Sequence, residues 1–363
     1  MQSLRHFAAA VLFTLAWLTA STAMAQSESL WTHPGGSGPV IVKAGFELLD
    51  INAVDEEAEA FEFEGVLRLI WRDPRLAFDP AEFGADEKVY KGSYQFTELY
   101  DGWWPQVVLA NESGSMDRQG VVLRIEPDGT VWYVEEVDAV AETSLDLRRF
   151  PFDRQVLEVR FQTLGYGVED VRLEAAPELS GLLQYGRDEI GTSSWRVQSY
   201  SVATMEHDVV VAGPEGVATG SLLLADILVA REPGYFLRVV VAPLVLLVML
   251  SWSVFWMDRE SLGERMDISF IGILTVVAFQ IMTEETLPRI SYFTIMSGFL
   301  AVNYLMLAAS VVVNLYVGGL DRTGRGAVGD RVDRRCRWLF PLVYFGLNLL
   351  WIPFYWRFVQ PSA

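Results

Sequence analysis

Acidic residues stand at both ends of an apolar stretch between residues 264 and 285. It starts with Glu264 and Asp267 and ends with Glu284 and Glu285. As a helix rising about 1.5 Å per residue, this stretch would span roughly 33 Å, one hydrocarbon thickness of a bilayer. A carboxylate inside a membrane span is costly when it faces lipid, so we expect Asp267 to face water or a partner.

Steps of three and four residues place one stripe of this predicted helix on a single face. The stripe consists of Glu264, Asp267, Ile271, Leu274, Ala278, Ile281 and Glu285. It is acidic at its ends and apolar between them, a pattern that predicts the lining of a cation pore. The alternative is that the terminal acids lie at the membrane surface and the stripe is ordinary helix packing.

Four apolar segments in the C-terminal part of the chain are long enough to cross a membrane. We predict spans at about 235–257, 264–283, 292–316 and 338–358. Before them, residues 1–25 have the basic start, short apolar run and Ala23-Met24-Ala25 end of a secretory signal peptide. The predicted domains are therefore a signal peptide at 1–25, an exported domain at 26–232 and a transmembrane pore domain at 233–363.

The exported domain is strongly acidic. Residues 26–232 contain 38 Asp and Glu against 16 Lys and Arg, which gives a net charge of -22. The whole chain has a net charge of -19, so the remaining segments are slightly basic. The negative charge of the exported domain excludes nucleic acid as an expected partner and favours the concentration of cations, although it could also serve only solubility. Six Arg and three Asp between Asp321 and Arg337 predict a cytoplasmic loop and hence a multi-pass protein of the inner cell membrane.

Cysteine and histidine are scarce. Cys336 is the single cysteine, so no disulfide can form within this chain. After the signal segment only His33 and His207 remain, which argues against a His/Cys metal cluster. We expect no cofactor.

Short alternating segments between Phe46 and Ala230 predict a β-sandwich. Leu157, Val159 and Phe161 alternate with polar residues, as expected for a strand with one buried face. The predicted fold class is α+β: an N-terminal antiparallel sandwich of about ten strands, followed by a bundle of four transmembrane helices.

The segment Leu147-Arg148-Arg149-Phe150-Pro151-Phe152-Asp153-Arg154-Gln155 resembles the signature loop of the Cys-loop, or pentameric ligand-gated, ion-channel family. In animal members two cysteines close this loop. The matching positions are Thr143 and Leu157, so the chain resembles bacterial members that lack the bridge. Further motifs follow in the family's order: Trp71-Arg72-Asp73, Trp103-Trp104-Pro105, Arg231-Glu232-Pro233, Pro243, Gly263-Glu264-Arg265-Met266 and Leu287-Pro288-Arg289.

The resemblance implies a homopentamer in the lipid bilayer whose second span lines the pore, so that each stripe residue becomes a ring of five. Rings of Glu264, Asp267, Glu284 and Glu285 would favour monovalent and divalent cations, and the apolar rings between them would block conduction by dewetting. Leu274 matches the family's gate leucine. We expect the Asp267 ring to bind divalent cations, and its crowded carboxylates to make conductance depend on pH.

The resemblance also implies a gating interface at the membrane surface. We expect Arg231 to pair with Asp153 and with an acid of the segment 55–57, and Pro288 to receive the movement of the sandwich. Independent surface ion pairs are the alternative. The candidate residues are Asp55, Glu56, Phe150, Pro151, Phe152, Asp153, Arg231, Pro288 and Arg289.

The agonist is left open by the sequence. The positions that match the aromatic box of animal receptors are Val66, Ala110 and Leu164, and the capping segment at about 206–221 has no aromatic residue. An acetylcholine-type site is therefore disfavoured. The candidate agonist residues are Tyr100, Trp104, Tyr133, Leu164, Tyr166, Tyr185 and His207, and an amine, a carboxylate or a proton could be the agonist.

Two other function classes compete with a channel. No nucleophile elbow, HExxH motif or phosphate loop is present in the sequence, which argues against an enzyme. A membrane-anchored extracellular binding or sensor protein without conduction is the second alternative. It would not require acids at both ends of one helical stripe.

Overall fold

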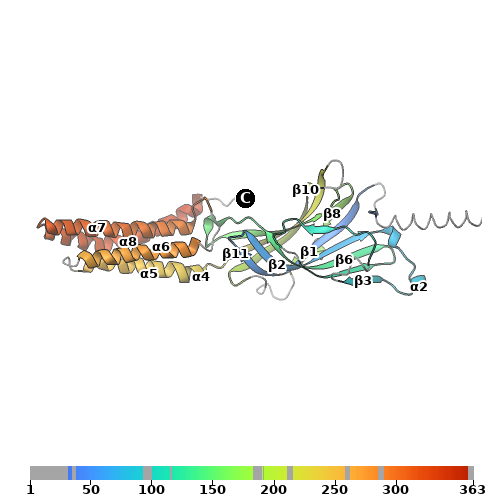
Figure 1. Cartoon of the computed structure of the whole chain (residues 1–363), viewed down its shortest axis with the longest axis horizontal. Coiled ribbons are helices and arrows are strands. Elements are labelled where there is room, and N and C mark those ends of the chain that lie inside the picture. The colour runs from blue at the N-terminus through green and yellow to red at the C-terminus, as the bar shows by residue number, and fades with distance from the viewer. Residues whose placement is uncertain are drawn as a thin grey trace, which may run out of the picture.

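The computed structural model describes residues 32–34, 38–92, 100–114, 117–182, 190, 192–210, 216–257, 262–284 and 290–358. A β-sandwich and a helical bundle lie end to end along the long axis of the molecule (Figure 1). The predicted signal segment and the candidates Tyr185, Glu285, Pro288 and Arg289 lie outside the described residues.

The larger sheet has seven strands in the order β3-β5-β6-β2-β1-β8, with β9 also paired to β1. Its strands are β1 (Val40–Asp55), β2 (Ala60–Arg72), β3 (Lys88–Gly92), β5 (Asp117–Ile125), β6 (Thr130–Glu142), β8 (Val171–Ala175) and β9 (Gly181–Leu182). The pairings among β1, β2, β3, β5 and β6 are antiparallel, as predicted, whereas β8 and β9 run parallel to β1. A parallel partner must return through a crossover, and local alternation of residues cannot reveal such a pairing.

The smaller sheet is antiparallel, with the order β10-β11-β7-β4. Its strands are β4 (Val107–Leu109), β7 (Arg154–Thr163), β10 (Trp195–Val210) and β11 (Val217–Arg231). β10 and β11 pair continuously from Trp195 with Arg231 to Val210 with Val217, apart from one bulge. The predicted capping loop at 206–221 is therefore mostly two paired strands. Short helices connect the strands: η1 (Pro74–Leu76), α2 (Pro80–Phe83), η2 (Leu147–Arg149) and η3 (Pro177–Leu179).

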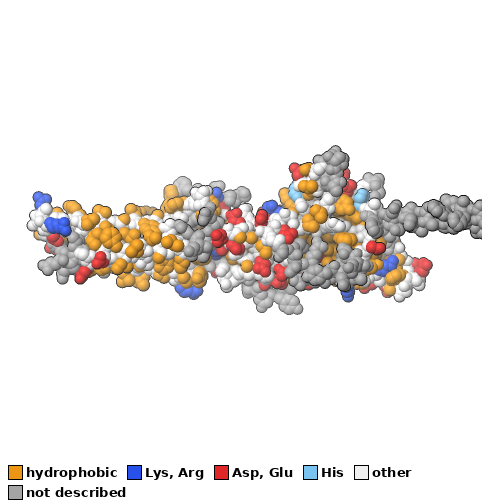
Figure 2. Space-filling model, in the orientation of Figure 1, with side chains coloured by type: hydrophobic (Ala, Val, Ile, Leu, Met, Phe, Trp, Pro, Cys, Tyr) orange, Lys and Arg blue, Asp and Glu red, His pale blue; other side chains and the backbone are white. Residues whose placement is uncertain are grey.

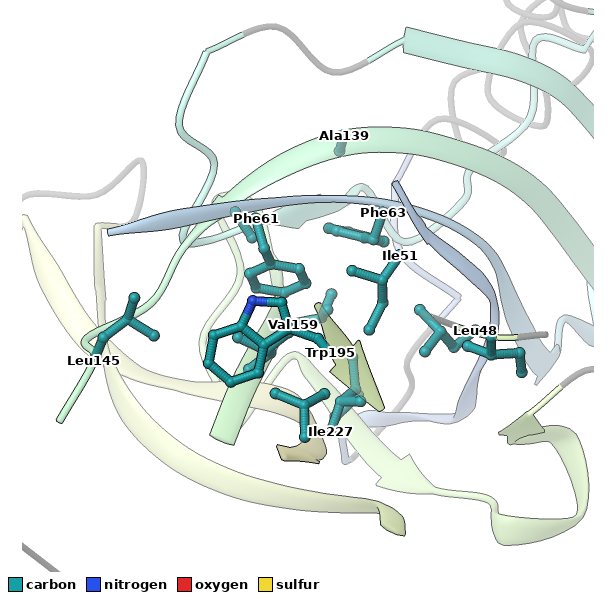
Figure 3. Close-up of a cluster of buried hydrophobic side chains, with 14 of the residues drawn as sticks. Leu48, Ile51, Phe61, Phe63, Ala139, Leu145, Val159, Trp195 and Ile227 are labelled. Atoms are coloured by element: carbon teal, nitrogen blue, oxygen red, sulfur yellow. The ribbon is translucent and has the colours of Figure 1, made fainter. Parts of the chain in front are cut away.

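The core of the sandwich lies between the two sheets. Phe61 and Phe63 of β2 face Val159 of β7 and Ile227 of β11, and Trp195 lies among them (Figure 3). These side chains are almost completely buried. Burying a side chain of this size contributes roughly 1.5–3 kcal/mol, so the domain is held by its core.

Four helical segments form the second half of the molecule, and each is apolar and long enough to cross a membrane. The first consists of α4 (Gly234–Phe236), η4 (Leu237–Val241), α5 (Ala242–Ser251) and η5 (Trp252–Trp256); the others are α6 (Leu262–Glu284), α7 (Ile295–Arg322) and α8 (Gly326–Phe358). Hydrophobic side chains cover the visible face of this half, whereas acidic side chains gather on the sandwich (Figure 2).

The predicted loop between Asp321 and Arg337 is mostly helical. α7 continues to Arg322 and α8 already begins at Gly326, so only residues 323–325 connect them. The polar composition marks where the helices leave the apolar region, but it does not end them. The third helix also begins at Ile295, after the predicted residue 292, where the Thr294 hydroxyl accepts a hydrogen bond from Ser297 N.

Candidate functional site

One face of α6 is exposed in the single chain. Ile271, Leu274 and Ile281 have exposed fractions of 61%, 67% and 53%, and Glu264, Asp267 and Ala278 are exposed as well. All described side chains of the predicted stripe therefore share one uncovered face. Glu284 is the last residue of α6, and its side chain is not among those described.

The opposite face of α6 is buried against the neighbouring helices. Arg265, Ser269, Gly272 and Val276 are buried at spacings of three and four residues. Ser310 of α7 donates a hydrogen bond to Ser269 Oγ at 3.2 Å, and Asn314 Nδ2 does the same at 3.2 Å. Since these contacts lie on the buried face of α6, they leave the acidic and apolar stripe directed away from the bundle.

Arg231 connects three segments at the boundary between the sandwich and the helices. Its Nε lies 2.8 Å from Asp153 Oδ1, and its Nη1 lies 2.6 Å from Glu56 Oε1. The Arg231 and Asp153 side chains are each 1% exposed, and Glu56 is 20% exposed. The structure thus forms both pairs expected from the sequence. A buried pair of this kind leaves an uncompensated charge if one partner is removed.

Aromatic rings enclose the Arg231 guanidinium. It lies 4.1 Å from the centroid of Trp195 and 4.9 Å from that of Phe150. Phe150 is fully buried, and its ring meets Phe236 of the first span at 4.8 Å. Pro151 is also buried and Phe152 is partly buried. The signature loop is therefore packed directly onto the start of the first span.

The same loop contacts two other helices. Tyr292, just before α7, accepts a hydrogen bond from Leu147 N at 3.0 Å. The Arg148 guanidinium lies over the Tyr292 ring, and Arg149 lies over Trp356 near the end of α8. Movement of this loop would therefore reach α4, α7 and α8 together.

The base of the loop is closed without a disulfide. The Thr143 hydroxyl donates a hydrogen bond to the carbonyl oxygen of Val156 at 3.1 Å. Asp55, another predicted interface residue, instead accepts a hydrogen bond from Ala58 N within the turn after β1. Of the segment 55–57, Glu56 is the acid that pairs with Arg231.

The candidate agonist residues fall into separate places. Tyr100 and Trp104 lie in one aromatic cluster, with ring centroids 6.2 Å apart, and the neighbouring Trp103 donates to Tyr166 OH at 3.0 Å. Tyr100 itself is buried, and burial raises its pKa. It is therefore a neutral phenol at physiological pH.

The other candidates lie elsewhere on the sandwich. Tyr133 is buried and its hydroxyl donates to Glu135 Oε2 at 2.8 Å. Leu164 is 50% exposed. His207 Nε2 lies 2.8 Å from Gln162 Oε1, between β10 and β7. The structure does not gather these three residues around one site.

Asp226 is a notable acid that the sequence analysis missed. It lies on β11 directly opposite Glu158 of β7, and its Oδ1 is buried with no hydrogen-bond partner among the described residues. Burial raises the pKa of Asp226, and the like charge of Glu158 raises it further, whereas Arg160 lowers it. An acid within the apolar run Leu222–Val229 was the available sequence signal.

A cavity of about 920 Å³ adjoins Asp226. It extends along the signature loop to Tyr292 and Trp356, and Asp153 also lines it. The cavity therefore connects Asp226, a carboxyl group with a raised pKa, to the loop that holds the ion pair of Arg231.

Comparison with known families gives two matches. Residues 28–212 match the neurotransmitter-gated ion-channel ligand binding domain, and residues 240–325 match the neurotransmitter-gated ion-channel transmembrane region. The first range covers the sandwich up to the end of β10, and the second runs from η4 in the first span to just past the end of α7.

Relatives among curated proteins cover both halves. The chain is 25% identical to a proton-gated ion channel of Gloeobacter violaceus, over 87% of this chain and 84% of the relative. It is also 25% identical to γ-aminobutyric acid receptor subunit beta of Caenorhabditis elegans and subunit rho-1 of Mus musculus. Those matches cover 82% and 84% of this chain but only 53% and 61% of the receptor subunits.

Proposed function

Because the chain belongs to the family of neurotransmitter-gated ion channels, we propose that five copies form a cation-selective channel in the inner cell membrane. In this proposal α6 lines the pore, the sandwich lies outside the cytoplasm, and the boundary between the domains falls near residue 232. An anchored sensor without conduction is the competing proposal.

The exposed stripe of α6 carries this proposal. A single chain leaves Ile271, Leu274 and Ile281 uncovered on the same face as Asp267, although the other face of α6 is packed. Lipid would accept the apolar residues but not the carboxylate. A water-filled channel between copies accommodates both.

Cation selection is assigned to the end of α6 that lies away from the sandwich. Rings of Glu264 and Asp267 would lower the energy of cations there and raise that of anions. Glu284 and Glu285 would form the corresponding collar at the other end. The apolar rings between the collars would exclude water when the pore narrows, which gives a closed state without a physical plug.

Opening is assigned to the signature loop. Arg231 is bonded to Asp153 of the loop and to Glu56 of the turn between β1 and β2. It also directly precedes the first span. A displacement of either sheet would therefore pull on the helices through one buried cation.

Two agonist classes are supported by different observations. The proton-gated relative favours protons, as does Asp226 Oδ1, which is buried without a hydrogen bond in the described part of the chain. The γ-aminobutyric acid receptor relatives favour a small molecule with an ammonium and a carboxylate group. We place the proton first because it needs no aromatic box, and the positions matching that box are Val66, Ala110 and Leu164.

Reconstitution of the purified protein into liposomes tests the function. We expect a fivefold-symmetric particle that passes sodium or potassium current after a step to acidic pH, with a reversal potential near that of the cation. Small amines and carboxylates applied at fixed pH test the second agonist class. A reversal potential at the chloride value would overturn cation selectivity. A silent monomer under all conditions would favour the anchored sensor.

A further inference from the structure

Arg265 lies in the sequence between Glu264 and Asp267, the two acids assigned to cation selection, but its side chain is directed toward the neighbouring helices. Its side chain is 1% exposed, whereas Glu264 and Asp267 are exposed. Successive helical residues are about 100° apart, so Arg265 and Asp267 are separated by about 200° around α6. The direction of Arg265 therefore determines the direction of the acids.

Asp333 of α8 holds this arginine. Arg265 Nη2 lies 2.9 Å from Asp333 Oδ1, and Nη1 lies 3.3 Å from Oδ2. The Asp333 side chain is 7% exposed. Two parallel bonds to a planar guanidinium fix its orientation as well as its position. Because the pair is buried, rotation of this turn of α6 would leave two charges without partners.

Further directional bonds hold this end of α6 against its neighbours. One turn further on, Ser269 receives hydrogen bonds from Ser310 and Asn314 of α7. α8 is in turn attached to the first span, because Arg337 Nε donates to the carbonyl oxygen of Phe255 at 3.0 Å. Beyond Ser269 the buried face continues with Gly272 and Val276, and Tyr304 OH of α7 donates a hydrogen bond to Gln280 Oε1 at 2.7 Å near the other end of α6.

We propose that Arg265 and Asp333 are positioning residues that fix the rotation of the first turns of α6 and so direct Glu264 and Asp267 into the pore. This inference rests on the proposed function, since it takes α6 as the pore-lining helix. It assigns a selectivity role to α8, which itself contributes no residue to the pore stripe.

Thiol modification of the whole channel measures the rotation directly. Cys336 is first replaced by serine, and a cysteine is then placed at position 267 or, separately, at the half-buried position 268. The ratio of their modification rates by a charged, water-soluble thiol reagent reports which side of the helix faces the pore. In the Cys336→Ser background we expect position 267 to react faster.

Asp333→Asn should reduce this ratio of modification rates by about two- to thirty-fold, which is the fold-change that corresponds to typical coupling energies between packed sites. Arg265→Lys keeps the charge but cannot form two parallel bonds, so it should reduce the ratio less and is the deciding variant if Asp333→Asn does not assemble. The double variant Arg265→Asp/Asp333→Arg, which swaps the two charges, should restore part of the ratio. Asp330→Asn is the matched control, because Asp330 is an exposed acid three residues earlier on α8.

An unchanged ratio in assembled Arg265→Lys and Asp333→Asn channels would overturn the positioning role. The background protein, without these substitutions, tests the proposed function itself. If position 267 reacts no faster than 268 in the background protein, α6 does not face the pore with this stripe, and the inference falls with that assignment.

Discussion

Arg231 Nε donates to Asp153 Oδ1 at 2.8 Å, and this bond joins the last residue of β11 to a loop 78 positions earlier in the chain. Both side chains are buried, and the strand leads directly into the first span. The pair therefore links the signature loop directly to the strand that leads into the membrane.

Arg231→Ala is expected to abolish activation while the channel still reaches the membrane. Removing one partner of a buried ion pair typically costs about 3–5 kcal/mol, here at the connection between the domains. Current recording together with surface labelling measures the effect. Arg196→Ala is the control, because Arg196 forms a pair with Glu232 in which its side chain is 68% exposed and such pairs contribute about 1 kcal/mol or less. Normal activation of the Arg231→Ala channel would contradict the coupling role.

Asp267→Asn is expected to weaken the preference for cations and to reduce block by divalent cations. The substitution removes five negative charges from one ring of the proposed pore while keeping the size of the side chain. Reversal potentials in a salt gradient, with and without calcium, measure both effects. Asp330→Asn on the exposed surface of α8 should change neither. An unchanged selectivity and an unchanged divalent block would remove Asp267 from the constriction.

Asp226→Asn is expected to stabilise the folded protein at neutral pH and to make opening less dependent on acid. Since the folded pKa of Asp226 is raised, its ionised form weakens the folded state above that pKa, and this effect disappears as the pH falls through it. Thermal unfolding measured from neutral to acidic pH should show the stability gain of the variant shrinking with acidification.

The matched control for this experiment is Asp128→Asn. Hydrogen bonds from the backbone and side chain of Thr130 lower the pKa of Asp128, so the native carboxylate stabilises the turn and its removal should have the opposite sign. If Asp226→Asn keeps a constant stability difference at every pH and the native proton response, Asp226 is not a proton sensor.

Gly298→Ala is expected to destabilise the packing of α7 on α8. A Cβ atom at position 298 would lie 2.0 Å from Cε2 of the Trp351 indole, which itself donates to the carbonyl oxygen of Ile295. Overpacking of this kind typically costs about 1–3 kcal/mol, measured as a lower unfolding temperature in detergent. Gly319→Ala in the same helix has open space and should be close to neutral. Equal effects of both substitutions would contradict the close contact.

The features that could be predicted from the sequence are those that depend on local patterns of residues. The stripe of α6 and the ion pairs of Arg231 lie in motifs whose spacing or family resemblance is visible without coordinates. The sequence predicts a loop at 321–337 because the arginines there indicate a membrane boundary, whereas no comparable signal shows how far a helix continues past that boundary. Asp333 and Arg265 are 68 positions apart, so only the register of α8 on α6 brings them together.

The hydrogen bond from Thr143 to Val156 has a consequence for how the protein matures. A hydroxyl group makes the contact that closes the loop, and the chain contains one thiol in total. Folding of the loop therefore does not depend on the redox state of the surroundings, and reductants should leave channel activation unaffected.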